Sequence, residues 1–244
     1  GINMAKYKRV LLKLSGEALA DKEDHRILNA HSLEVIGKSI KNMVDSGVQV
    51  AIVVGAGNIW RGKLAEQIGI EHSTADYMGM LGTIINSLAL QSAIENSGVD
   101  CRVLSAIEVR AVAEPYIRRR AIRHLEKGRV VIFAGGTGNP YFTTDTTATL
   151  RAMEIEAQAV LMAKNDVEGV FTADPHVDPN ATLISEITYE EMLAKNLKVM
   201  DLTAVSLCMQ GDIDIRVFNM KNPDNFLRVI NGESIGTRIS KGDK

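Results

Sequence analysis

The stretch VLLKLSG (residues 10–16) is the first indication of the fold, because it is an apolar segment that runs directly into a polar turn with a glycine. Two later segments have the same design: VVGAGN (residues 53–58) and AGGTGN (residues 134–139). Each is predicted to be a strand that ends in a glycine-bearing turn. The carboxyl ends of parallel strands lie along one edge of a sheet, so these turns can meet although they are far apart in the sequence.

Similar strands alternate with helical segments along the chain. Apolar, often β-branched runs predict strands at residues 10–14, 48–54, 102–104, 130–134, 159–163 and 215–218. Helices are expected from a Ser32 cap to Gly47, from Ser73 or Thr74 to Asn96, and after the capping box of Thr188 and Glu191. This alternation predicts an α/β fold, a three-layer αβα sandwich around a mainly parallel sheet with right-handed crossovers.

The composition of the chain is typical of a globular protein and does not favour a nucleic-acid-binding, membrane or disulfide-rich class. The chain has 244 residues, a net charge of -2 and 24% charged residues, which fits one globular domain. A near-neutral balance gives no support for a nucleic-acid partner, and no apolar run approaches the length that spans a membrane. Cys101 and Cys208 are too few for a disulfide framework and lack metal-site spacing. We therefore expect buried thiols in a cytoplasmic protein.

The three turns predict a site for phosphate groups. Glycine lets the backbone approach a ligand, and a helix that begins after the turn adds positive potential for an anion. Lys13 and Arg61 could neutralise phosphate oxygens. One such turn is more often a plain connection, but three turns with two cations favour a polyphosphate or two phosphorylated ligands. Dinucleotide-binding, P-loop and protein-kinase signatures are absent from the sequence.

These segments resemble the bacterial uridylate (UMP) kinases of the amino-acid-kinase family. The similarity runs in order from about residue 7 to about residue 237, and TGNPYFTTD is its most specific string. The matching segments are KLSGE (13–17), GAGNIWRG (55–62), DYMGM (76–80), TGNPYFTTD (137–145), VFTADP (170–175), VMD (199–201) and IRVFN (215–219).

The resemblance implies an enzyme that transfers the γ-phosphate of ATP to UMP, with Mg²⁺ at the phosphates, in pyrimidine nucleotide biosynthesis. Catalytic roles fall on Lys13, Arg61, Asp145 and Asp201, with no residue assigned as a direct metal ligand. The ATP side is implied to contain Lys13, Leu14, Ser15, Gly16, Gly57, Arg61, Asn165, Phe171 and Asp174. The UMP side is implied to contain Ala56, Asp76, Thr137, Gly138, Asn139, Pro140, Tyr141, Phe142, Thr143 and Thr144.

The family also implies an organisation and regulation. We expect one domain over residues 1–244, with UMP bound roughly by residues 1–150 and ATP roughly by residues 151–244. A homohexamer, a GTP activator and a UTP inhibitor are implied in the same way. Residues 21–26 (DKEDHR) replace a glycine-rich segment that relatives link to GTP activation, which leaves this activation open. Ala56 replaces the middle of three glycines, and its methyl group requires a negative φ.

Other interpretations stay open at this level. Each acid has a structural explanation: Asp76 in a first helical turn, Asp145 as a helix cap, and Asp174 in a turn before Pro175. An acyl-phosphate kinase of the same fold, acting on acetylglutamate or aspartate, is one alternative function. A non-catalytic nucleotide sensor is another. The five histidines lie outside the motifs and are expected at the surface.

Overall fold

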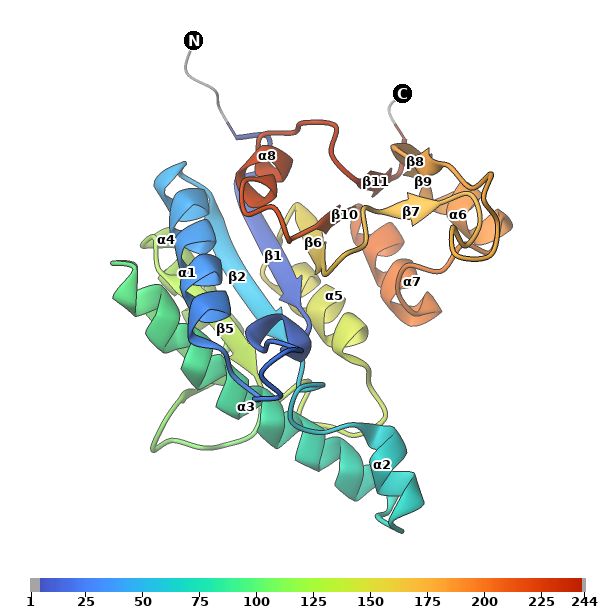
Figure 1. The fold of residues 1–244 in the computed structure, drawn as a ribbon. Coiled ribbons are helices and arrows are strands. Elements are labelled where there is room, and N and C mark those ends of the chain that lie inside the picture. Colours follow the sequence, from blue (N-terminus) through green and yellow to red (C-terminus); the bar gives the residue numbers. More distant parts are fainter. Residues whose placement is uncertain (1–4, 243–244) are drawn as a thin grey trace.

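A nine-stranded sheet forms the centre of the protein. The computed structural model describes residues 5–242 (Figure 1). The sheet has the order β4-β3-β5-β2-β1-β6-β10-β11-β9. Its strands are β1 (Arg9–Leu14), β2 (Gln49–Val54), β3 (Cys101–Ser105), β4 (Glu114–Pro115), β5 (Val130–Ala134), β6 (Ala159–Lys164), β9 (Glu186–Thr188), β10 (Asp214–Asn219) and β11 (Thr237–Ser240). A separate hairpin pairs β7 (Val170–Phe171) with β8 (Leu183–Ile184).

The strands that carry the glycine turns are parallel neighbours. Strand β1 pairs with β2 on one side and β6 on the other, and β2 pairs with β5. Their carboxyl ends therefore share one edge of the sheet. The six predicted strands are all present, with ends within one residue of the prediction. No pattern in the sequence analysis predicts β11, which runs antiparallel to β10.

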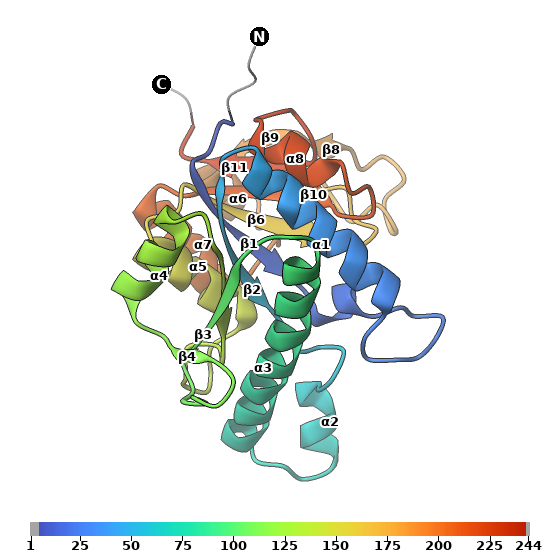
Figure 2. The ribbon, with the colours of Figure 1, turned by 90° about the vertical axis from the view of Figure 1, so that its left-hand side faces the viewer.

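Helices cover both faces of the sheet (Figure 2). They are α1 (Ala30–Asp45), α2 (Gly62–Gln67), α3 (His72–Asn96), α4 (Arg118–Glu126), α5 (Thr144–Glu154), α6 (Tyr189–Ala194), α7 (Leu202–Gly211) and α8 (Asn225–Ile230). Buried residues of α1, α3 and α8 form one core, and those of α4 to α7 form another. Along β1, Val10 and Leu12 face the first core while Leu11 faces the second. The predicted three-layer αβα sandwich is therefore confirmed.

Several local predictions are corrected. Asn29, not Ser32, caps α1, because its side chain accepts a hydrogen bond from the Ser32 amide. Helix α3 begins at His72, before Ser73 and Thr74. Thr188 does cap α6, accepting from the Glu191 amide at 3.1 Å. His124 is buried rather than at the surface, since its ring lies between Glu114 and Arg129 at 3.2 Å from each.

Both cysteines are free and buried, as expected, and burial raises the pKa of each thiol to about 12. Over residues 5–242, no helix combines the length and the apolar character needed to cross a bilayer.

Candidate active site

The three glycine turns meet at the edge of the sheet. A methyl group added to Gly16 would lie 2.8 Å from the Gly57 nitrogen and 2.9 Å from the Gly55 oxygen. One added to Gly55 would lie 3.7 Å from the Thr144 hydroxyl, which belongs to the segment after the third turn. The glycine of the first turn thus packs directly against the backbone of the second turn. The second turn in turn packs against Thr144, which follows the third turn. The predicted convergence of the turns is confirmed.

Two polar residues of α3 hold the second and third turns in place. Asn86 is fully buried, and its amide nitrogen donates to the Gly55 carbonyl at 2.8 Å. Three residues earlier, the Thr83 hydroxyl accepts a hydrogen bond from the Gly135 amide at 2.9 Å. Residues three apart lie on the same face of a helix. Helix α3 therefore fixes the distance between the two turns.

A cavity of about 240 Å³ opens between these turns and α3. Its apolar walls come from Trp60, Met80 and Phe133, and the Trp60 indole is fixed by a hydrogen bond to the Ala75 carbonyl at 3.0 Å. Of the residues implied for UMP or ATP, those that line it are Ala56, Gly57, Asp76, Thr137, Asn139, Phe142, Thr143 and Thr144. Most of the implied acceptor residues are thus gathered around one space.

Ala56 fits its turn because α3 makes room for it. Ala56 is not among the described residues with a positive φ, so its methyl group causes no backbone strain. A methyl group added to Gly82 would lie only 2.9 Å from the Ala56 side chain. The methyl group of Ala56 therefore occupies the space that glycine at position 82 leaves empty.

Charged groups gather where β1 and β6 end beside α5. Lys13 Nζ lies 3.3 Å from Asp145 Oδ1, and both side chains are largely buried. That carboxylate oxygen has no hydrogen-bond partner among the described residues. Burial, then the nearby charge of Lys13, lowers the pKa of Lys164 at the end of β6. Two lysines and one carboxylate thus form a partly desolvated cluster with a net positive charge, which suits an anion.

Replacing Lys164 with methionine is expected to stabilise the protein at pH 7. The change removes a charge that is disfavoured by burial and by Lys13, while the Lys13–Asp145 pair remains. Between the lowered folded pKa and the ordinary value of 10.5, the unfolded state binds more protons, so wild-type stability rises with pH. The advantage of the variant should therefore shrink as pH approaches 10.5.

Urea unfolding at several pH values measures this effect. Lys22→Met is the matched control, because Lys22 is exposed in a turn and its replacement relieves no burial of a charge. A Lys164→Met variant that is less stable than wild type at pH 7 would contradict the prediction.

Asp201 joins α7 to the start of α5. Its carboxylate accepts from the Ala204 amide at 2.9 Å, which caps α7, and from the Thr146 hydroxyl at 3.0 Å. It also accepts from the Thr143 hydroxyl. Asp145 does not cap α5, because Thr143 does so through the Thr146 amide. The structure thus places Asp201 behind the cavity wall, where it orients two threonines of α5.

Asp76, which lines the cavity, contacts Tyr141 in the loop after the third glycine turn. The Tyr141 amide donates to Asp76 Oδ2 at 2.6 Å, although Tyr141 has a φ of 73°. Its ring stacks on His72 with centroids 4.8 Å apart, and its hydroxyl lies 3.0 Å from the Ser73 hydroxyl. A left-handed tyrosine needs such external support. The loop of residues 139–143 is therefore fastened to the beginning of α3.

Other predicted residues lie apart from this cavity. Arg61 is exposed and pairs with Glu17, so it links the second turn to the first. Asn165 follows β6 at the same sheet edge, and Phe171 pairs with Leu183 in the β7–β8 hairpin. Asp174 begins the exposed turn beyond it and accepts from the His176 amide at 2.9 Å. The β7–β8 hairpin, which contains Phe171, lies in the half of the molecule that also contains β10, β11 and α6 (Figure 1).

Sequence reasoning missed Lys164, Thr83, Asn86 and Trp60. Lys164 could have been found from its position directly after a predicted strand. Strands β1 and β6 are parallel neighbours, so Lys164 lies at the same sheet edge as Lys13. Thr83 and Asn86 are polar residues in an otherwise apolar part of a helix, at a spacing of three. Polar side chains that are buried need partners. The glycine turns supply these partners.

Comparisons with known proteins show which family and which solved structures the chain resembles. The model of the Amino acid kinase family matches residues 8–219. A crystal structure of UMP kinase from Bacillus anthracis has 44% identity and a TM-score of 0.94, with 97% of each chain covered. UMP kinase from Ureaplasma parvum has 38% identity and a TM-score of 0.91, over 97% of this chain and 100% of that one. Uridylate kinase from Archaeoglobus fulgidus has 29% identity and a TM-score of 0.72, over 95% and 99%.

Proposed function

Because this chain belongs to the amino acid kinase family, we propose that it is a UMP kinase that transfers the γ-phosphate of ATP to UMP. The observation that carries the proposal is the cavity between the second and third glycine turns. Its lining contains Thr137, Asn139 and Thr144, and the next residue, Asp145, belongs to the cationic cluster. An acceptor in the cavity would thus have its phosphate directed toward Lys13 and Lys164.

The chemistry requires positioning and charge stabilisation. An oxygen of the UMP phosphate attacks the γ-phosphorus of ATP, the new O–P bond forms, and the bond to the β,γ-bridging oxygen breaks to release ADP. The UMP phosphate is already ionised at neutral pH, so no general base is needed. Lys13, Lys164 and Arg61 would stabilise the negative charge on the transferred group. Each lysine does so as a point charge next to Asp145.

Mg²⁺ fits this site through one carboxylate. No group of three or more histidine, cysteine, aspartate or glutamate residues within residues 5–242 could hold a metal by itself. Mg²⁺ commonly binds through one or two carboxylates together with substrate phosphates. Asp145, whose Oδ1 lies beside the Lys13 ammonium and has no hydrogen-bond partner among the described residues, is the residue that would hold it. The ion would supply charge neutralisation at the phosphates of bound ATP.

The two nucleotides would occupy the two halves of the sheet edge. Asp76 is the carboxylate placed to accept hydrogen bonds from the ribose hydroxyls of UMP, once the Tyr141 amide is displaced. Residues 137–144 would surround its base and phosphate. The ATP phosphates would lie over residues 13–16 and Gly57, and its adenosine near Asn165, Phe171 and Asp174. This division corresponds roughly to residues 1–150 for UMP and 151–244 for ATP.

The remaining family traits are part of the same proposal. Helix α3 exposes an apolar row at a spacing of four, formed by Tyr77, Leu81 and Ile85, which supports assembly of the chain into a homohexamer. The family resemblance implies UTP as an inhibitor, and it implies GTP as an activator if residues 21–26 can replace the glycine-rich segment of the relatives. The cytoplasm, where UMP and ATP are both present, is the expected location.

A coupled assay of ADP release tests the function. We expect turnover with UMP, at least about tenfold less with CMP, and none with acetylglutamate, because a site that pairs with polar groups of a base rejects a base that cannot pair. Turnover with acetylglutamate and not UMP would establish the acyl-phosphate kinase alternative. ATP binding without turnover of any acceptor would establish the sensor alternative.

A further inference from the structure

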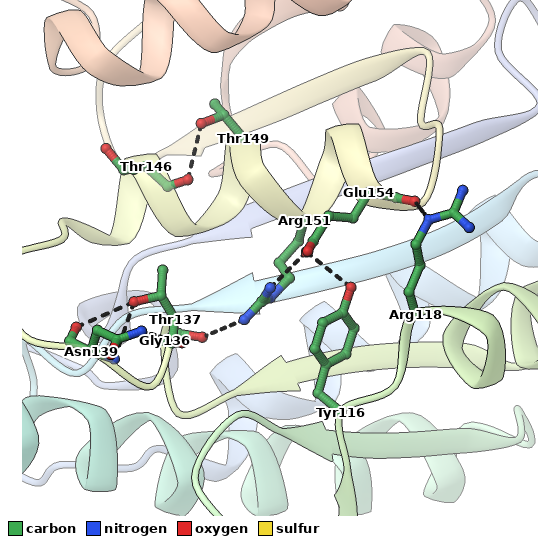
Figure 3. Close-up of polar contacts among 9 residues, drawn as sticks. All are labelled: Tyr116, Arg118, Gly136, Thr137, Asn139, Thr146, Thr149, Arg151 and Glu154. Atoms are coloured by element: carbon green, nitrogen blue, oxygen red, sulfur yellow. Dashed lines mark hydrogen bonds and ion pairs between the residues drawn. The ribbon is translucent and has the colours of Figure 1, made fainter.

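A buried arginine on α5 contacts the backbone of the third glycine turn (Figure 3). Arg151 is only 5% exposed. Its Nη2 donates to the Gly136 carbonyl at 3.1 Å, and its Nη1 donates to Glu154 Oε1 at 2.6 Å. One planar guanidinium therefore bridges a helix carboxylate and a turn carbonyl, a geometry that the single ammonium of lysine does not reproduce.

The turn that Arg151 contacts has an unusual backbone. Gly135 and Gly136 have φ values of 77° and 57°, and the Gly138 amide closes the turn on the Gly135 carbonyl at 3.0 Å. Thr83 binds the Gly135 amide, so the entry of the turn is already fixed by α3. The carbonyl of Gly136 is held from the opposite side by Arg151. Because Gly136 and Thr137 both line the cavity, the position of this peptide sets the shape of the cavity wall.

The guanidinium is held by its own supports. It lies 4.2 Å from the centroid of the Tyr116 ring, a cation–π distance. The Tyr116 hydroxyl donates to the same Glu154 oxygen at 2.9 Å, and the ring packs edge-on against Phe133 of β5. Arg118 contacts only the outer part of this network, where its Nε donates to the Glu154 carbonyl (Figure 3). Arg151 is therefore the residue of this network that donates a hydrogen bond to the backbone of the third glycine turn.

We propose that Arg151 is a positioning residue that holds the Gly136 peptide in the conformation required to bind the acceptor nucleotide. Arg151 shapes the UMP side of the site and not the ATP side. It acts through the turn and does not contact the reacting atoms. The effect of Arg151 on UMP binding rests on the proposed function. Its hold on the Gly136 peptide is independent of that function.

Two measurements on Arg151→Lys test the proposal, with Arg118→Ala as the matched control. Amide hydrogen exchange of residues 135–138 in the protein without nucleotide should be at least about tenfold faster in Arg151→Lys and unchanged in Arg118→Ala. In steady-state kinetics, the KM for UMP should rise about tenfold while the KM for ATP stays within about twofold. Glu154→Gln keeps the hydrogen bonds and removes the charge, so it should show the same pattern with a smaller rise in the KM for UMP. This variant replaces Arg151→Lys if Arg151→Lys does not fold.

The results separate this inference from the proposed function. Unchanged exchange of residues 135–138, or equal rises in both KM values, would overturn the role of Arg151 even in an active UMP kinase. Faster exchange in a protein whose wild type does not phosphorylate UMP would support the hold on the turn and overturn the proposed function. A selective rise in the KM for UMP together with faster exchange would support both.

Discussion

Replacing Lys13 with alanine is expected to lower kcat about a hundredfold while leaving the protein folded. Loss of one preorganised charge contact in a transition state commonly costs about 3 kcal/mol. The fold should survive because Lys164 lies in the same cluster and can neutralise Asp145 when Lys13 is gone. Removing the like charge of Lys13 should also raise the pKa of Lys164, since that charge is one cause of its lowered value.

Single-turnover kinetics and thermal unfolding measure the two parts of this prediction. Lys38→Ala is the control, because Lys38 is an exposed lysine that pairs with Glu34 four residues away on α1. It should keep full turnover. A Lys13→Ala protein with wild-type kcat would remove Lys13 from the mechanism. A variant that fails to fold would show that Lys164 does not compensate for the missing charge at Asp145.

Replacing Gly16 with alanine should lower kcat/KM about a hundredfold, through the backbone and not through a lost functional group. The added methyl group would lie 2.8 Å from the Gly57 nitrogen and 2.9 Å from the Gly55 oxygen, so the first two turns must separate. Misplacing a reacting group by about 1 Å can cost about a hundredfold in rate. Overpacking should also lower the free energy of unfolding by about 1–3 kcal/mol.

Gly37→Ala separates the loss of activity from the loss of stability. A methyl group there would lie 2.7 Å from the Ala93 carbonyl, a similar overlap with backbone, but between α1 and α3 and away from the turns. We expect this control to lose stability and to keep kcat/KM near the wild-type value. Equal losses of activity in both variants, measured on folded protein, would show that general destabilisation explains the effect of Gly16→Ala.

Sequence patterns predict the strands of this protein more accurately than its helix caps and its buried histidine. Residues 10–14 and 130–134 were identified as strands because a buried parallel strand is apolar on both faces, and this property is local. Cap positions were less well predicted: Ser32 and Asn29 are both good caps, and only the backbone decides which one precedes the first turn. His124 was misplaced because its burial depends on Glu114 and Arg129, which no local pattern connects to it.

Residue types and their local spacing predict the layered α/β fold, the three glycine turns, the family resemblance and the places of Lys13 and Asp145 in its motifs. These features depend on residue type and spacing within about ten neighbours, which is the range over which strand period, helix period and turn chemistry act.

Which side chains meet depends on how the layers pack and cannot be read from local sequence. Lys164 beside Lys13, Asn86 on the Gly55 carbonyl, Gly82 under Ala56 and Arg151 on the Gly136 carbonyl are contacts made across the layers of the sandwich. The physical reason is that most buried polar groups need a hydrogen-bond partner and that a closely packed interior leaves little empty space beside a buried glycine. The packing of whole helices against the sheet, and not the local sequence, determines which partner lies within reach.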